Sequence, residues 1–316
     1  MTNTKLNELG ELLERIDIAS ILFKKGDIYY TSDDTRGKID WACEFDTLYI
    51  QTKKKINSQF LMAELINDDV LRVFDHSRIH FCQTNNIEDV KNIITCDKFF
   101  LHVVNEEDNY SNFFLKYGVF ITPSIVHFLK DLDKPSIYSC SLEEMKYQFY
   151  KNEIGFMSPT GYRYVVLASK LRNKGNEILA SEDEGILKRG EIELKFEEAR
   201  RLFCDWAPSR LSALYLMDNS YESKFNLGNM FRKSSSKQTP YIIEFKLAGL
   251  IRLIKVDYRW YEEYSNNPNE EYLFNYWSSL PFEDKSTTWE YLYEGGVLMA
   301  NQKQIDYFND KKIDLI

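Results

Sequence analysis

The sequence contains little glycine, proline or cysteine: 13 Gly, 7 Pro and 5 Cys in 316 residues. The scarcity of Gly and Pro excludes collagen-like and linker-dominated architectures. The cysteines are odd in number and widely spaced, and they form no CxxC pair. This pattern predicts reduced thiols in the cytoplasm and argues against a structural zinc site, which needs clustered ligands.

Long apolar runs are also missing. No stretch approaches the roughly 20 apolar residues that cross a bilayer, and the first residues lack the pattern of a secretory signal. Histidine is scarce, and only His76 and His80 have the i, i+4 spacing of helical metal ligands. Without further ligands nearby, they are expected to be surface residues. We therefore expect a cytoplasmic protein with no membrane contact and no metal.

Basic residues are fewer than acidic ones: the chain has 40 Lys and Arg and 49 Asp and Glu, which gives a net charge of −9. Such a chain is not built to coat nucleic acid non-specifically. The acidity lies mostly in residues 1–150, which carry 17 basic and 24 acidic residues, against 23 and 25 in the remainder. A hydrophobic fraction of 44% is enough to form a core and excludes wholesale disorder.

Hydrophobic periodicity predicts an α+β fold with a boundary near residue 155. In the first half, helices are expected at 5–25, 124–132 and 141–153, and strands at 27–30, 47–51, 79–83 and 98–104. Ser141 and Glu144 form a capping-box pattern at the start of the third helix. We assign 1–155 to an N-terminal α+β domain of unknown role.

The second domain, 156–316, is expected to be rich in strands. A turn or linker at 157–161 should lead into strands at 162–169, 212–217, 241–247, 250–257, 289–295 and 297–300. One amphipathic helix at 194–206 should separate the first two strands, and 266–271 should be a loop.

Three stretches of this domain occur in a telling order: YRYVVLAS at 162–169, PSRLSALYLMDNS at 208–220 and TWEYLYEGGVLM at 288–299. Their order and spacing resemble bacterial ADP-ribosyltransferase-fold enzymes, including RES-like NAD-consuming toxins and phage-defence enzymes, over about 160–316. The resemblance implies a split β-sheet catalytic domain that uses NAD as its substrate. It also implies a toxin or antiviral role, with an antitoxin as the expected partner of a toxin.

In that family a first strand supplies Arg or His, a second supplies Tyr or Ser, and a late strand supplies Glu. The resemblance therefore implies catalytic roles for Arg163, Tyr215 and Glu290. A guanidinium suits the pyrophosphate, an aromatic ring suits the flat nicotinamide, and a carboxylate stabilises the cationic ribose that forms when nicotinamide leaves.

Other residues of these stretches complete the expected site. Tyr164, Ser212 and Arg210 are further candidates for NAD contact, and Ser212 is also an alternative to Tyr215. Glu294 lies four residues after Glu290, so in a strand it points to the same face and is the second candidate for the carboxylate. For Arg163, Tyr215 and Arg210, a role on the surface or in the core is the alternative.

Two other functional classes remain open. Glu244 and Lys246, with Asp218 at an earlier strand end, resemble the Mg²⁺ site of restriction-like nucleases, although Glu-x-Lys is common in exposed strands. The other class is a non-catalytic interaction module. NAD hydrolysis by the same fold is a further alternative to transfer.

One segment bears on which molecule would accept the ADP-ribosyl group. Residues 223–241 carry four cations, no acidic residue and interleaved aromatics. The cations are Lys224, Arg232, Lys233 and Lys237. Mixed cations and aromatics suit single-stranded nucleic acid, and a solvated loop is the alternative. We expect transfer to nucleic acid, with RNA favoured, or to protein.

Overall fold

The structure is a computed structural model with a mixed α+β fold. The ranges it describes are 4–15, 19–25, 28–31, 47–52, 60–65, 70–75, 80–95, 99–105, 118–122, 137–148, 161–172, 181–220, 223–227, 240–282 and 287–313. The helix expected at 124–132, most of the 157–161 turn and most of the 223–241 segment lie outside these ranges.

Before residue 150, the described elements are short, and strands outnumber helices. They are α1 (Thr4–Arg15), β1 (Ala19–Lys25), β2 (Ile28–Thr31), β3 (Thr47–Thr52), β4 (Phe60–Leu65), β5 (Leu71–Asp75), β6 (His80–Thr84), α3 (Ile87–Thr95), β7 (Phe99–Asn105), β8 (Val119–Ile121) and α6 (Leu142–Gln148).

After residue 160, the elements are longer. They are the π-helix η2 (Tyr162–Leu167), α8 (Ala168–Arg172), α9 (Ser181–Phe203), β9 (Leu214–Asp218), β10 (Pro240–Asp257), α11 (Tyr258–Asn266), α12 (Glu270–Trp277), β11 (Trp289–Met299) and α13 (Gln302–Ile313).

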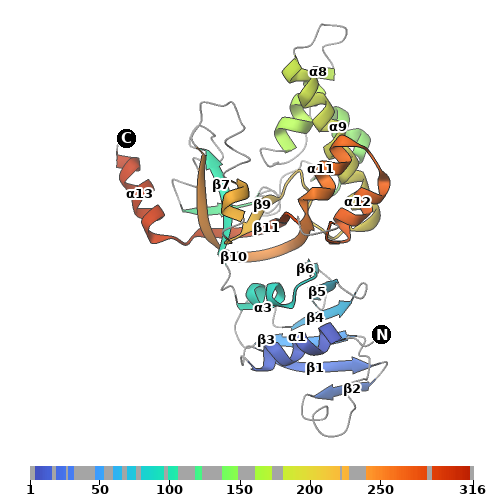
Figure 1. Cartoon of the computed structure of the whole chain (residues 1–316), viewed down its shortest axis with the longest axis vertical. Coiled ribbons are helices and arrows are strands. Elements are labelled where there is room, and N and C mark those ends of the chain that lie inside the picture. Colours follow the sequence, from blue (N-terminus) through green and yellow to red (C-terminus); the bar gives the residue numbers. More distant parts are fainter. Residues whose placement is uncertain are drawn as a thin grey trace.

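All described strands belong to one sheet, in the order β2-β1-β3-β4-β5-β6-β10-β7-β9-β11-β8. An additional pairing joins β10 to β11, so β10, β7, β9 and β11 close into a small barrel. Figure 1 shows β1–β6 with α1 and α3 as one body, and the barrel with the longer helices as the other. Strands β7 and β8, which precede residue 155, are hydrogen-bonded into the second body.

Barrel closure depends on the length of β10. Its first half pairs with β7 over Pro240–Lys246, while Phe245–Asp257 pairs with β11. Two register shifts interrupt the second ladder, at Leu247/Gly249 and Leu250/Arg252, opposite the glycines of β11. Such bulges increase the local bend and twist of a strand, which lets one strand serve both sides of a closed barrel.

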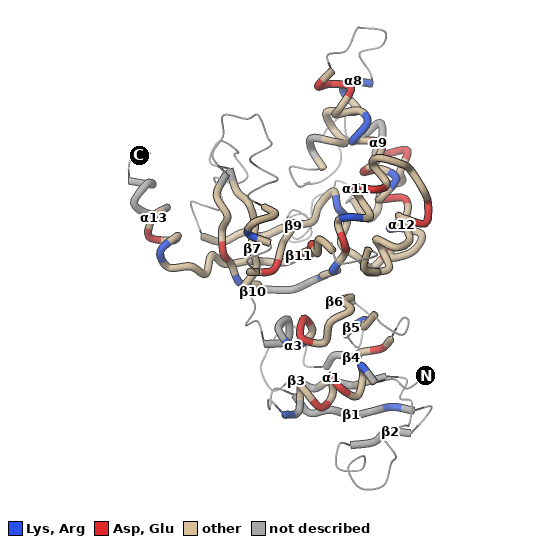
Figure 2. The backbone as a smooth tube through the Cα atoms, in the orientation of Figure 1, with Lys and Arg blue, Asp and Glu red and all other residues tan. Residues whose placement is uncertain are grey.

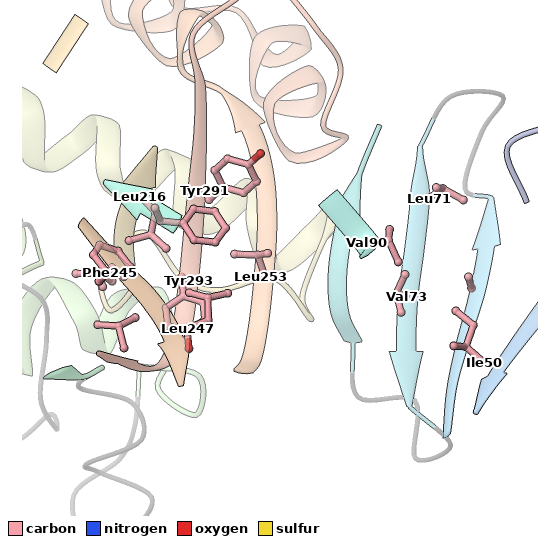
Figure 3. Packing of buried hydrophobic residues seen from close by; sticks show 14 of the residues in the cluster. Ile50, Leu71, Val73, Val90, Leu216, Phe245, Leu247, Leu253, Tyr291 and Tyr293 are labelled. Carbon is pink, nitrogen blue, oxygen red and sulfur yellow. The ribbon is translucent and has the colours of Figure 1, made fainter. Parts of the chain in front are cut away.

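The buried hydrophobic side chains of the two bodies belong to one cluster, which has two groups in Figure 3. Inside the barrel, Leu216, Phe245, Leu253, Tyr291 and Tyr293 point toward one another (Figure 3). The other group in the same figure, Ile50, Leu71, Val73 and Val90, packs within β3–β6 and under α3. A second cluster lies on the outer face of β10 and β11, where α9, α11 and α12 supply aromatic rings.

The helix expected over 5–25 is wrong for residues 19–25. Residues 19–25 form β1, which pairs with both β2 and β3. The run Ile-Leu-Phe satisfies helical spacing, yet a short apolar run with a β-branched residue fits a strand equally well, and pairing with two neighbouring strands decides for the strand.

The strand expected at 162–169 is also wrong, because this stretch is helical in η2 and α8. Val165 and Val166 are buried against Leu194 of α9 and Leu211. A β-branched, aromatic sequence predicts a strand locally, and burial against a long helix overrides that preference. Arg163 is therefore on a helix, and its side chain lies outside the described residues.

Each of the two long strands, β10 and β11, replaces two shorter strands that the sequence predicts. Strand β10 spans both 241–247 and 250–257, and β11 spans 289–295 and 297–300 almost entirely. Between them lie α11 and α12, so the expectation of one helix in this half and of a loop over all of 266–271 is wrong. Asp257 and Asn269 cap these helices by accepting hydrogen bonds from Arg259 N and Glu271 N.

Several expectations are confirmed. Strand β9 covers most of 212–217, and the helix expected at 194–206 is the end of the longer α9. The capping box is present, since Ser141 N donates to Glu144 Oε2 at 2.6 Å and Glu144 N donates to Ser141 Oγ at 3.1 Å. The boundary at residue 155 stays a prediction, because 149–160 lie outside the described ranges.

Candidate active site

Strand pairing brings three of the expected residues onto one face of the barrel. Tyr215 of β9 is directly opposite Leu292 of β11, and β10 places Val256 opposite Glu290 and Arg252 opposite Glu294. Directly opposed residues share a face, and alternate residues of a strand do too. Tyr215, Glu290 and Glu294 therefore share the outer face, which α9, α11 and α12 cover (Figure 1).

Arg210 joins this group from the turn before β9. Its Nη1 donates to Glu290 Oε1 at 2.8 Å, and its Nε donates to Glu193 Oε2 of α9 at 3.0 Å. Tyr276 of α12 also donates to Glu290 Oε1, at 2.7 Å, and contacts Arg210. The guanidinium carbon lies 5.0 Å from the centre of the Tyr215 ring. The sequence-predicted Arg210, Tyr215 and Glu290 are thus in direct contact.

Burial sets the ionisation of the Arg210–Glu290 pair. The pKa of Glu290 is raised because burial penalises its charge, and this outweighs the opposing effect of Arg210 and Tyr276. Burial alone would lower the pKa of Arg210, but Glu193, the surrounding tyrosines and Glu290 raise it well above its usual value. Arg210 therefore stays charged, whereas burial disfavours the charged form of Glu290.

Glu290 is anchored through one oxygen. Both of its hydrogen bonds end on Oε1, while Oε2 accepts none from the described residues. The side chain keeps 10% of its surface exposed. A carboxylate held at one oxygen and open at the other can accept hydrogen bonds from a bound hydroxyl group without losing its position.

Glu294, the alternative carboxylate, is buried, and protein groups surround both of its oxygens. Its Oε1 accepts from Ser212 Oγ at 3.0 Å and from Tyr138 Oη, and its Oε2 lies 3.9 Å from Arg252 Nε. Its side chain is only 2% exposed. The burial of Ser212 in this cluster also leaves that serine inaccessible to a ligand. Geometry therefore distinguishes two glutamates that the sequence leaves equivalent.

A second buried ion cluster fixes the turn that carries Arg210. Glu197 accepts from Arg200 Nη2 at 2.8 Å, Arg201 Nε at 2.9 Å and Ser209 Oγ at 2.8 Å. Burial would raise the pKa of Glu197, but these hydrogen bonds lower it. Arg200 also donates to the Asp205 and Ala207 carbonyls at 2.6 and 3.1 Å. The turn is thus bound to α9 on both sides of Pro208.

Sequence reasoning missed Glu193, Glu197 and Arg200. The signal was present, because these residues recur at intervals of three and four on the same helix face as Phe196, which is fully buried. Charged residues of opposite sign on an apolar helix face indicate a paired internal cluster.

Two of the remaining candidates for NAD contact have well-defined surroundings. The Tyr164 ring lies 5.8 Å from the Arg189 guanidinium carbon. Tyr215 donates its hydroxyl to the Arg210 carbonyl at 2.7 Å, and its own carbonyl is 2.8 Å from His102 Nδ1. The role of Arg163 stays a prediction.

The basic segment and the nuclease residues lie elsewhere. Lys224, on a short helix at 223–227, forms an ion pair with Glu244 at 3.3 Å, while Arg232, Lys233 and Lys237 are outside the described ranges. Asp218 accepts from Ser220 Oγ at 2.9 Å, and Lys246 lies 4.6 Å from the centre of the Phe99 ring. Within the described ranges, no group of three His, Cys, Asp or Glu side chains is placed to hold a metal.

No protein-family profile matches the chain, and neither does any curated protein. Of the helices that the structure describes, none has the length and apolarity needed to cross a membrane.

Proposed function

We propose that the protein is an NAD-dependent ADP-ribosyltransferase whose catalytic carboxylate is Glu290. The observation that carries the proposal is the geometry of this side chain: Arg210 and Tyr276 hold Oε1, Oε2 accepts no hydrogen bond from the described residues, and the side chain keeps 10% of its surface exposed. Glu290 also lies on the late strand β11, where the resemblance expects the catalytic glutamate. Arg210 acts as the positioning residue.

The proposed reaction transfers the ADP-ribosyl group from nicotinamide to an acceptor. The bond between C1′ of the ribose and the pyridinium nitrogen breaks, and its electron pair neutralises the departing nicotinamide. Glu290 accepts hydrogen bonds from the ribose hydroxyls and stabilises the positive charge on the sugar. An acceptor hydroxyl or amine then donates a lone pair to C1′ and loses its proton to solvent.

The acceptor is proposed to be nucleic acid, with RNA favoured and protein as the alternative. The support is the basic, aromatic sequence of 223–241 in an otherwise acidic chain. Its described cation, Lys224, keeps 45% of its side chain exposed while paired with Glu244. A toxin or antiviral effector is the biological role that such an activity fits.

The test combines labelled NAD, purified protein and cell lysate, followed by RNase, DNase or protease. We expect label that RNase removes, and a loss of about 100-fold or more in Glu290→Gln, the size typical of losing one charge-stabilising group. Glu262→Gln, an exposed change on α11, is the control and should retain full activity.

Each contrary result has a definite meaning. Label that resists both nucleases and yields to protease replaces RNA with a protein acceptor. Free ADP-ribose without labelled macromolecule indicates hydrolysis. An intact NAD pool, or full activity in Glu290→Gln, overturns the proposal.

A further inference from the structure

A cavity of about 680 Å³ lies beside α9, away from the Arg210–Glu290 cluster. Residues of α6, α8, α9 and the end of α11 line it. Because an α-helix has 3.6 residues per turn, the lining residues Lys188 and Glu191 project from the side of α9 opposite Glu193, which contacts Arg210. The cavity is therefore a separate site, and its volume is in the range typical of small-molecule sites.

The inner wall of the cavity is apolar. Ile192 and Leu194 of α9 and Tyr264 of α11 line it, and all three are buried. The Tyr264 ring packs edge-on against Phe196, with ring centres 5.4 Å apart and planes 87° apart. Because this packing already fixes the wall, an apolar side chain can bury its surface there without a rearrangement of the protein.

The charged residues that line the cavity are balanced. In the described part of the chain, the lining has three basic residues (Arg172, Lys188, Lys195) and three acidic ones (Glu143, Glu191, Glu198). Lys195 and Glu198 pair with each other at 2.8 Å, whereas Lys188 and Glu191 form no ion pair with a described residue. Figure 2 likewise shows acidic and basic residues together along α9. Such a lining disfavours a polyanion and suits a ligand with one charge of each sign.

Arg172, the last residue of α8, supplies the observation that points to a ligand. Its Nη1 is buried, yet it donates a hydrogen bond to no acceptor in the ranges that the structure describes. A buried donor without a partner is rare, and it costs the desolvation free energy of the group. A carboxylate in the cavity would supply the acceptor, because its two oxygens match the guanidinium fork.

We infer that this cavity binds a short apolar peptide with free termini, about the size of a dipeptide. The peptide carboxylate accepts hydrogen bonds from Arg172 and is also attracted by Lys188. The peptide ammonium group donates to Glu191, and an apolar side chain packs on the buried inner wall. The inference is independent of the proposed transferase activity, because the residues that carry it lie outside the Arg210–Glu290 cluster.

The test measures equilibrium binding of the dipeptide phenylalanyl-leucine to the full-length protein. A C-terminal amide on the dipeptide should weaken binding by about tenfold or more, the typical effect of losing hydrogen bonds to a charged group. Arg172→Ala should cause a similar loss with the free dipeptide and no further loss with the amide, because both changes remove the same contact.

The other end of the peptide has its own test. Glu191→Gln should weaken binding of the free dipeptide but leave binding of its N-acetyl form unchanged, because acetylation removes the ammonium charge. Glu191 is exposed, so this variant also tests the site if Arg172→Ala fails to fold.

Lys170→Ala is the matched control. Lys170 is exposed on the same short helix as Arg172 and is not among the described residues that line the cavity. Its alanine variant should bind the dipeptide like the wild type, as should Glu290→Gln, and thermal unfolding should show that the alanine variants remain folded. No dipeptide binding by the wild type, equal binding of the acid and the amide, or an equal loss in both alanine variants overturns the inference.

Discussion

At the scale of single residues, the site depends on charges that are buried and paired. Arg210 contacts Glu193 and Glu290, and its environment keeps it protonated. Removing one partner of such a cluster leaves the other charge buried and unpaired, which costs far more than an exposed ion pair is worth. The cluster therefore acts as a rigid support for the Glu290 side chain, which keeps 10% of its surface exposed.

The raised pKa of Glu290 predicts an acid limit for activity. The proposed transfer needs the carboxylate form, so the acidic limb of the rate profile should have its midpoint above 4.5, the ordinary value for glutamate. Lowering the pH protonates Glu290 and should decrease turnover before typical exposed glutamates titrate. The measurement is the pH dependence of kcat/KM for NAD, which reports the free enzyme, and a midpoint at or below 4.5 contradicts it.

At the scale of elements, close packing between α9 and η2 positions the side chains around the site. A glycine at 190 allows the approach, and α9 in turn carries Glu193 and Glu197. Because protein interiors have little free volume, a shift of η2 should also move α9 and the side chains it carries.

Gly190→Ala should therefore destabilise the protein despite the higher helix propensity of alanine. The added Cβ would meet the Tyr164 backbone at 2.2 Å and the Ala168 Cβ at 2.8 Å, so η2 must move. We expect a loss of about 1–3 kcal/mol in the free energy of unfolding, as for overpacked cores.

Gly185→Ala is the control on the same helix. No atom lies within 4 Å of a Cβ at position 185, so alanine should stabilise the helix by about 0.5–1 kcal/mol. Denaturant unfolding of both variants gives the comparison, and equal effects at the two positions would rule out the packing explanation.

At the scale of the whole molecule, buried polar contacts join the two bodies. Asp89 of α3 accepts from Thr84 Oγ1 at 2.9 Å and from Tyr291 Oη of β11 at 3.0 Å, and Lys255 Nζ of β10 lies 3.1 Å away. Gln83 of β6 also donates to the Trp277 carbonyl at 3.3 Å. The barrel therefore meets the first body through specific, desolvated contacts.

Asp89→Asn should reduce the free energy of unfolding by about 3–5 kcal/mol, because it leaves the Lys255 charge buried without its counter-ion. Glu88→Gln, next to it on α3, breaks an exposed pair with Lys91 and should cost at most about 1 kcal/mol. Urea unfolding measures both variants, and a similar small effect in each would show that Asp89 contributes little to joining the bodies.

The sequence by itself determined the α+β class, the capping box of α6 and the positions of most strands, and it singled out Arg210, Tyr215 and Glu290, which the structure brings into contact. These follow from local periodicity and from charged residues within apolar stretches. Only the tertiary structure decided that 162–169 is helical, that β7 closes the barrel with later strands, and that Glu290 has hydrogen-bond partners on one oxygen while Glu294 has protein groups around both. Each of these depends on contacts between residues far apart in the chain, which local sequence patterns do not encode.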